Sequence, residues 1–199
     1  MQSKIKNLIF DVGGVLIFIK KIEFSRLDKK FGLPRGTIKR IFKASSKRVV
    51  VDKHFDESIF FKQNFSHLLN WHDYHQILKQ WLATERLNKW LVGWIKRKRK
   101  NYRIILLTNY TAALEWRLEK KFKIAHHFDH VFNSADIGIA KPNPRIFRHL
   151  LRNIKAKAGE CLFVDNKEKN IETAEKLGFQ TILFKNNRQF RERLRKLKI

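Results

Sequence analysis

The chain has 199 residues, of which 43% are hydrophobic and 13% aromatic, and this composition excludes disorder along its whole length. No stretch approaches the ~18 consecutive apolar residues of a membrane-spanning helix, so we expect no membrane partner. The formal net charge of +26 fits partners that carry phosphates, but solvated basic helix faces produce the same excess.

The first predicted strand, Leu8–Phe10, ends at an aspartate that is soon followed by two glycines, in the sequence "IFDVGGVL" of residues 9–16. Paired glycines pack no side chain and cost chain entropy, so Gly13 and Gly14 need a backbone reason. Either the chain turns sharply after Asp11, or a ligand comes very close to the main chain there.

The start of the chain and its cysteine content predict the compartment. Lys4 and Lys6 precede an apolar stretch, as in a signal peptide, but Asp11 and the glycines interrupt it and no small-residue cleavage site follows. The single cysteine, Cys161, excludes an intramolecular disulfide and fits a reducing cytosol. We therefore expect a soluble, cytoplasmic protein in which Cys161 is a small core residue.

A long run of helical patterns separates the first strand from the second, where a crossover between parallel strands usually needs about a dozen residues. We expect residues 18–92 to form an inserted helical cap domain, and residues 1–17 and 93–199 to form the core domain. Trp71, Trp81, Trp90 and Trp94 are expected to pack within the cap and against the core, rather than to stack on a substrate.

Strands and helices alternate through the rest of the chain. Further strands are predicted at 104–107, 130–134, 162–164 and 181–184, with helices near 111–122, 144–153, 168–177 and 188–197. Asn143 before Pro144 is typical of a helix start, and Gly178 is typical of a helix end. The alternation predicts an α/β fold with a doubly wound parallel sheet.

Polar residues follow three of the predicted strands. Open α/β sheets bind ligands beyond the carboxyl ends of their strands, where these residues should meet. Asp11 is a candidate nucleophile or metal ligand, and Asp165 is a second oxygen ligand suited to Mg²⁺. Thr108 and Asn109 offer a hydroxyl, an amide and backbone N–H groups, while Lys141 offers a positive charge. This set predicts a phosphoryl-transfer site.

Four segments together resemble a known family. In order, "FDVGGVL", "LLTN", "KPNPRIF" and "FVDNKEKNIETAEKLGF" resemble the four motifs of the haloacid-dehalogenase (HAD) superfamily of hydrolases. The resemblance spans the whole chain and is closest to the subgroup whose first motif reads Asp-x-Gly-Gly/Asn, which includes small sugar-phosphate phosphatases. It implies a Rossmann-like core with a small helical cap and the activity of a phosphoric monoester hydrolase.

The resemblance also implies roles for individual residues. Asp11 would be the nucleophile and would form an aspartyl-phosphate that water hydrolyses. Thr108 and Asn109 would hold the phosphoryl oxygens, and Lys141 would neutralise charge in both steps. Mg²⁺ would be bound by Asp11, by the backbone carbonyl of Gly13 and by Asp165. Asn170 matches a position that supports the last of these motifs.

Two positions depart from the family pattern. Most phosphatases of the superfamily have a second aspartate, a general acid and base, where this chain has Gly13. The last motif usually has two adjacent acids, whereas here Asp165 is followed by Asn166. The cap histidines (His54, His67, His72 and His75) are alternative proton donors, although surface positions explain them more simply.

The sequence favours a Mg²⁺-dependent phosphatase for a small phosphorylated metabolite, with sugar phosphates as one class. The alternative is a weakly active or inactive relative that binds a phosphorylated ligand or nucleic acid through basic stretches such as "KRKRK" at 96–100. Nucleic-acid binding of that kind would be sequence-independent and weakened by salt. Haloacid dehalogenation is disfavoured because it needs no metal, yet Asp165 is present. No oligomeric state follows from the sequence.

Overall fold

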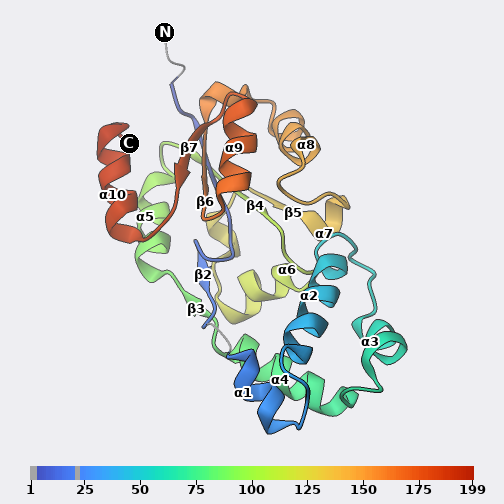
Figure 1. Cartoon of the computed structure of the whole chain (residues 1–199). Helices are drawn as coiled ribbons and strands as arrows, with labels where there is room; N and C mark the ends of the chain where they lie inside the picture. The colour runs from blue at the N-terminus through green and yellow to red at the C-terminus, as the bar shows by residue number, and fades with distance from the viewer. Residues whose placement is uncertain (1–3, 21–22) are drawn as a thin grey trace.

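The computed structural model describes residues 4–20 and 23–199 and contains a five-stranded parallel sheet (Figure 1). Residues 1–3 of the expected core and 21–22 of the expected cap lie outside the described residues. The strand order is β5-β4-β1-β6-β7. The strands are β1 (Asn7–Phe10), β4 (Arg103–Thr108), β5 (His130–Asn133), β6 (Cys161–Asp165) and β7 (Gln180–Leu183). The predicted α/β fold is thereby confirmed.

Strand β1 lies at the centre of the sheet, and its residues are buried because strands flank it and helices cover both faces. Phe10 pairs with Leu106 of β4 on one side and with Val164 of β6 on the other. The carboxyl ends of these three strands are therefore aligned, and the residues that follow them meet at one edge of the sheet.

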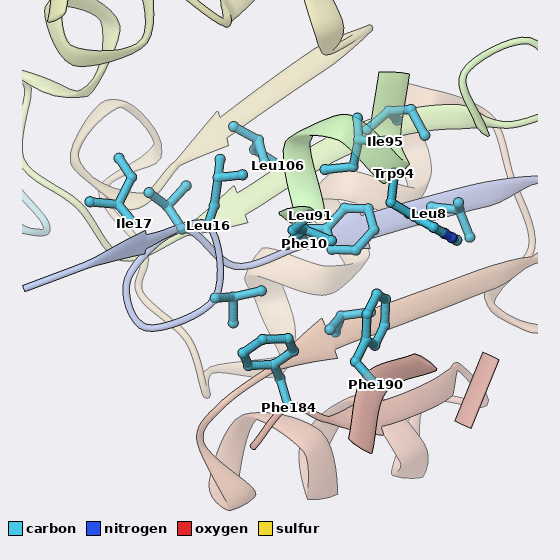
Figure 2. Close-up of a cluster of buried hydrophobic side chains, with 14 of the residues drawn as sticks. Leu8, Phe10, Leu16, Ile17, Leu91, Trp94, Ile95, Leu106, Phe184 and Phe190 are labelled. Atoms are coloured by element: carbon cyan, nitrogen blue, oxygen red, sulfur yellow. The ribbon is translucent and has the colours of Figure 1, made fainter. Parts of the chain in front are cut away.

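Helices cover both faces of the sheet. On one face Trp94 and Phe190 pack edge-on against Phe10, with ring centroids 6.3 Å apart in each pair (Figure 2). On the other face Phe147 packs against Phe163. The helices that supply these contacts are α5 (Lys89–Lys98) and α10 (Asn187–Lys196) on the first face, and α8 (Pro144–Ile154) and α9 (Glu168–Lys176) on the second.

The helix ends follow the sequence signals, but one predicted helix differs. Asn143 accepts a hydrogen bond from the backbone N–H of Arg145, and Gly178 has φ +87°, as expected at a helix end. The helix expected near 111–122 is instead a short α6 (Leu114–Trp116) that continues as a π-helical turn, η1 (Arg117–Lys121). The remaining short elements are η2 (Ala125–His127), α7 (Ser134–Ile137) and η3 (Ala158–Glu160).

Four helices between β1 and β4 have an apolar cluster of their own. They are α1 (Phe24–Lys30), α2 (Thr37–Val49), α3 (Glu57–Phe65) and α4 (Trp71–Ala83). This cluster extends from Phe24 to Trp81, whereas Leu91 and Trp94 of α5 belong to the cluster against the sheet. The packing therefore changes before the expected cap boundary at residue 92. We refer to α1–α4 as the cap, and the exact domain division stays a prediction.

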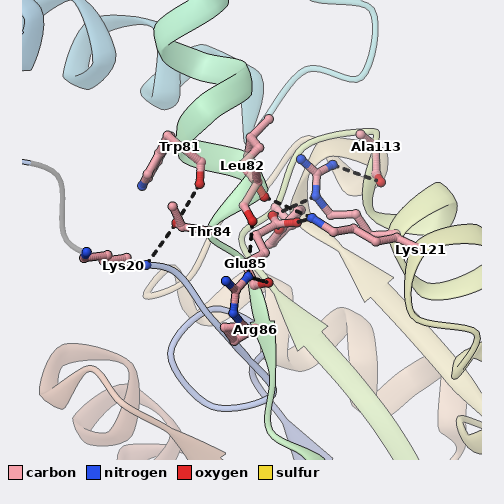
Figure 3. A network of polar contacts seen from close by, with 11 residues as sticks. Lys20, Trp81, Leu82, Thr84, Glu85, Arg86, Ala113 and Lys121 are labelled. Carbon is pink, nitrogen blue, oxygen red and sulfur yellow. Dashed lines mark hydrogen bonds and ion pairs between the residues drawn. The ribbon is translucent and has the colours of Figure 1, made fainter.

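A two-stranded ribbon and a buried carboxylate connect the cap to the core. Strand β2 (Ile17–Phe18) pairs antiparallel with β3 (Arg86–Leu87). Just before β3, the fully buried carboxylate of Glu85 accepts bonds from Arg117 Nε at 2.9 Å, Lys121 Nζ at 2.6 Å and the Tyr110 hydroxyl at 2.9 Å (Figure 3). The π-helical turn carries the two basic partners, so this network fixes one end of the cap to the core.

Two further findings bear on the expectations about membrane helices and about Cys161. No helix of the described residues combines enough length and apolarity to cross a membrane. Cys161 is buried at the start of β6, and burial raises the pKa of its thiol to about 12. Such a thiol stays protonated at neutral pH, which suits a core residue and not a nucleophile.

Replacing Glu85 should destabilise the protein in a pH-dependent manner. Burial alone would raise the pKa of Glu85, but hydrogen bonds from Lys121 and Arg117 outweigh it and hold the pKa below its usual 4.5. Its contribution is therefore present above pH 4.5 and lost as the pH falls through the lowered pKa. We expect Glu85→Gln to cost about 3 kcal/mol of unfolding free energy at pH 7, because it leaves Arg117 buried and unpaired.

Urea denaturation at pH 7 and at pH 3.5 measures both effects. Glu192→Gln is the matched control, because the Glu192 side chain is 55% exposed in a surface pair and should change stability by at most about 0.5 kcal/mol. A Glu85→Gln loss no larger than that of the control, or one equal at both pH values, would contradict the role given to Glu85.

Candidate active site

Two aspartates and one lysine form a buried cluster at the carboxyl edge of the sheet. Asp11 follows β1, Asp165 ends β6, and Lys141 precedes α8. Lys141 Nζ lies 2.9 Å from Asp11 Oδ1 and 2.7 Å from Asp165 Oδ2, and it also donates to the backbone oxygen of Leu107 at 2.7 Å. The three charged side chains are almost fully buried. Residues far apart in the sequence are thus brought into direct contact.

Neighbouring groups hold Lys141 and Asp165 in place. The Asn109 side chain accepts from the Lys141 backbone N–H and donates to its carbonyl, each at 2.8 Å. Asp165 accepts from Asn170 Nδ2 at 2.9 Å and from the backbone N–H of Lys167 at 2.8 Å. The Asn109 side-chain amide therefore positions Lys141. The sequence around Asn109 does not by itself indicate this contact. Asn170 supports the acidic residue, as the resemblance implies.

Thr108 presents a buried hydroxyl without a protein partner. It is 1% exposed at the end of β4, and its Oγ1 has no hydrogen-bond partner within the described part of the chain. Buried hydroxyls are nearly always hydrogen-bonded, so such an orphan calls for an explanation, and a ligand oxygen is one. Leu107, the residue before it, accepts a bond from Lys141 Nζ through its carbonyl, and β4 pairs with β1, so Thr108 stands at the same carboxyl edge as Asp11.

Positions 13 and 14, after Asp11, are glycines for different physical reasons. Gly14 has φ +81°, and a Cβ atom there would lie 2.1 Å from Nδ2 of Asn166, so only glycine fits. A Cβ atom on Gly13 would meet nothing within 4 Å, and its φ is not positive. Gly14 thus serves the turn and the close approach of Asn166, whereas Gly13 leaves open space beside Asp11.

The charges of the cluster do not cancel. Burial raises the pKa of Asp11 above its ordinary value, the Lys141 ammonium opposes the shift, and the Asp165 carboxylate adds to it. With both carboxylates ionised, one ammonium leaves a net charge of −1 in a buried place. A cation with oxygen ligands would relieve that imbalance.

The donor set fits Mg²⁺ when main-chain oxygen is included. The described residues contain no group of three or more His, Cys, Asp or Glu side chains that could hold a metal. Asp11 follows β1 and Asp165 ends the neighbouring strand β6, and Gly13 lies two residues after Asp11 in the open turn. Two carboxylates with a carbonyl and water are ligands typical of Mg²⁺.

The other candidate residues lie elsewhere. His54, His67, His72 and His75 are exposed, and none of them lines the cavity found between cap and core. The basic run 96–100 ends α5, and its Arg99 and Lys100 line a polar cavity with Asn7 and Arg103 at the amino ends of β1 and β4. The run is therefore at the opposite edge of the sheet from Asp11.

Comparison with known proteins identifies the family of the chain. The sequence profile of the haloacid dehalogenase-like hydrolases matches residues 5–178. The chain is 25% identical to D-ribitol-5-phosphate phosphatase of Bacteroides thetaiotaomicron, over 96% of this chain and 97% of that one. It is also 25% identical to bifunctional epoxide hydrolase 2 of Sus scrofa over 92% of this chain, but spans only 37% of that longer protein.

Solved structures show the same fold. A predicted HAD-like family hydrolase of Porphyromonas gingivalis superimposes with a TM-score of 0.78 at 26% identity, covering 98% of each chain. A HAD family enzyme of Bacteroides thetaiotaomicron, in complex with magnesium and inorganic phosphate, gives 0.73 at 21% identity and covers 92% of this chain and 96% of that one.

Removing the lysine should destabilise the cluster. Lys141→Met leaves two buried carboxylates facing each other, so we expect a loss of about 3–5 kcal/mol of unfolding free energy at pH 7 in the presence of a chelator. Adding Asp11→Asn to this variant should restore part of the loss, because it removes one of the two uncompensated charges. Urea denaturation measures both, with the exposed Lys169→Met as the control. A loss equal to the control would show that Lys141 does not bridge the carboxylates.

Proposed function

The chain belongs to the haloacid dehalogenase-like hydrolase family, and from this premise we propose that it is a Mg²⁺-dependent phosphatase of a small phosphorylated metabolite. The observation that carries the proposal is the buried Lys141 bridge between Asp11 and Asp165, next to the orphan hydroxyl of Thr108. A nucleophile, a positive charge and an unused donor around one point suit phosphoryl transfer.

We assign the nucleophile to Asp11. A carboxylate oxygen of Asp11 attacks phosphorus and forms an aspartyl-phosphate, while the bond to the leaving oxygen breaks. The electron pair of that bond stays on the leaving oxygen, which takes a proton from water. Thr108 donates its hydroxyl hydrogen to a phosphoryl oxygen, and the Lys141 ammonium stabilises the charge on the phosphoryl group. Water then attacks phosphorus, releases inorganic phosphate and restores the carboxylate. Asn109 acts by holding the Lys141 backbone, with its own N–H group as a further donor.

The metal proposal rests on the same cluster. Asp11, the Gly13 carbonyl and Asp165 would hold Mg²⁺, which supplies positive charge to the phosphoryl group when bound. A solved neighbour with this fold contains magnesium and inorganic phosphate. In this chain Asn166 provides an uncharged amide where a second acid is usual. We therefore expect the protein to bind Mg²⁺ weakly when no substrate is present.

The names of the relatives suggest the first compounds to test. D-ribitol-5-phosphate phosphatase matches along nearly its whole length, and glyceraldehyde 3-phosphate phosphatase of Methanothermobacter thermautotrophicus is 34% identical over 43% of this chain. Small sugar and polyol phosphates are therefore one class of candidate substrate.

Loss of the nucleophile should abolish the activity. We expect wild-type protein with Mg²⁺ to release phosphate from members of a metabolite panel, and Asp11→Asn to reduce the release to background, because an amide cannot attack phosphorus. Asp136→Asn, an exposed aspartate, is the control and should retain the wild-type rate. A wild-type protein that binds inorganic phosphate yet releases none from any compound would favour the alternative, an inactive phosphate-binding relative.

A carboxylate introduced at Gly13 should raise the rate of hydrolysis most for phosphates with poor leaving groups. General acid help is worth about 100-fold to 10,000-fold, and it matters most when the leaving oxygen is an alkoxide. Because a side chain at Gly13 meets nothing within 4 Å, Gly13→Asp should fold and should raise the rate on alkyl phosphates more than on aryl phosphates.

The comparison needs kcat/KM for both substrate types in both proteins. Gly14→Ala is the contrasting variant and should lose stability, because φ +81° and Asn166 exclude a side chain there. Equal gains on alkyl and aryl phosphates, or fast alkyl hydrolysis by the wild type, would indicate that another residue already supplies the proton.

A further inference from the structure

A cavity of about 590 Å³ lies between the cap and the core. Helices α2 and α4 line it from the cap, and Asn109, Tyr110 and Thr111 line it from the core. These three residues directly follow Thr108, so the cavity begins where the proposed phosphate site ends. Its volume lies within the range of small-molecule sites in proteins, about 300–1,000 Å³.

The cavity wall is mostly apolar. Phe42, Val49, Leu78, Trp81 and Leu82 form much of the cap side. Four charged residues, Lys39, Lys43, Glu57 and Arg117, complete the wall together with smaller polar ones. Apolar surface lining a cavity favours an apolar occupant, because each buried methylene group is removed from water.

Several polar groups in the wall are already engaged, although Lys39 and Lys43 also line it from α2. The Tyr74 hydroxyl donates to Glu57 at 2.5 Å and lies 3.3 Å from Ser45 Oγ. Arg117 is bound to Glu85, and the Asn109 amide is bound to the Lys141 backbone. Away from these two lysines, a polyol would bury hydroxyl groups that find few free partners, which costs free energy for each unsatisfied group.

Tyr110 connects the cavity to the charged cluster. Its side chain is 9% exposed, and the Glu85 network fixes its hydroxyl. Burial raises the pKa of Tyr110 well above its ordinary value; the Arg117 charge opposes this shift, whereas the charges of Glu85 and of Asp11 add to it. Asn109, the residue before Tyr110, also lines the cavity and is hydrogen-bonded to the Lys141 backbone, so the cavity extends to a direct neighbour of the cluster.

We propose that the leaving group of the substrate is apolar: a phosphate monoester whose aromatic or aliphatic body fills the cavity between α2, α4 and Tyr110, rather than a sugar or polyol. The inference rests on the proposed phosphatase function. It makes Val49, Leu78 and Trp81 residues that determine specificity, while the carboxyl edge of the sheet handles the phosphoryl group.

A series of para-n-alkylphenyl phosphates, from methyl to pentyl, tests the proposal with wild-type protein and Mg²⁺. These substrates share nearly the same leaving-group pKa, so kcat/KM reports only the added methylene groups. Each one buried should raise kcat/KM about four-fold until the cavity is full. A flat or falling series would overturn the proposal. In a second pair, n-hexyl phosphate should exceed hexitol 1-phosphate at least ten-fold, and the reverse order would also overturn it.

Two further measurements keep the inference separate from the proposed function. If no compound releases phosphate, the phosphatase assignment fails, but calorimetry with para-alkylbenzyl phosphonates still decides the inference. Affinity that grows with chain length supports it, and constant affinity overturns it. Val49→Phe, which narrows the cavity, should lower the ratio of pentyl to methyl kcat/KM at least ten-fold. Ile59→Phe, at a side chain outside the cavity and 54% exposed, should leave that ratio unchanged.

Discussion

The ammonium group of Lys141 is the contact on which the arrangement of the carboxyl edge depends. Its three hydrogen bonds reach Asp11 after β1, the backbone of Leu107 in β4 and Asp165 at the end of β6. Two carboxylates buried this closely repel each other, so the sheet can bring the ends of β1 and β6 together only with a cation between them. The same need explains why Asn109 commits both ends of its amide to the lysine backbone.

The core and the cap contribute different kinds of residues to the two sites. The core supplies every charged group of the cluster, whereas the cap supplies a mostly apolar wall in which, among the described residues, no histidine takes part. Tyr110 and Glu85 connect the two parts, because the tyrosine follows the phosphate-side residues and its hydroxyl is bound to the carboxylate beside the ribbon. A shift of the cap on the core would therefore move Glu85 and, with it, the Tyr110 side chain that lies between the cluster and the cavity.

The sheet was predictable from sequence because each strand is a short apolar run that ends at a polar residue. The convergence of Asp11 and Asp165 followed from the same rule. The π-helical turn was not predicted, and its ion pairs join it to Glu85, a residue distant in sequence that nothing in the local pattern marks as buried. The different roles of Gly13 and Gly14 required the position of Asn166, and the cavity required the packing of two parts of the chain.

The central position of β1 has a consequence for the order in which the protein assembles. Asn7 meets Arg103 across 96 positions of sequence, and the pairing with β6 is more distant still. The cap helices make contacts closer in sequence and have their own apolar cluster, so they can collapse while β1 still has no partner. During synthesis β1 stays unpaired until the later strands β4 and β6 have been made. An unpaired apolar strand favours aggregation, so the chain is most prone to aggregate in that interval. Asp11, the proposed nucleophile, is thus made before the strands β4 and β6 that hold it in place.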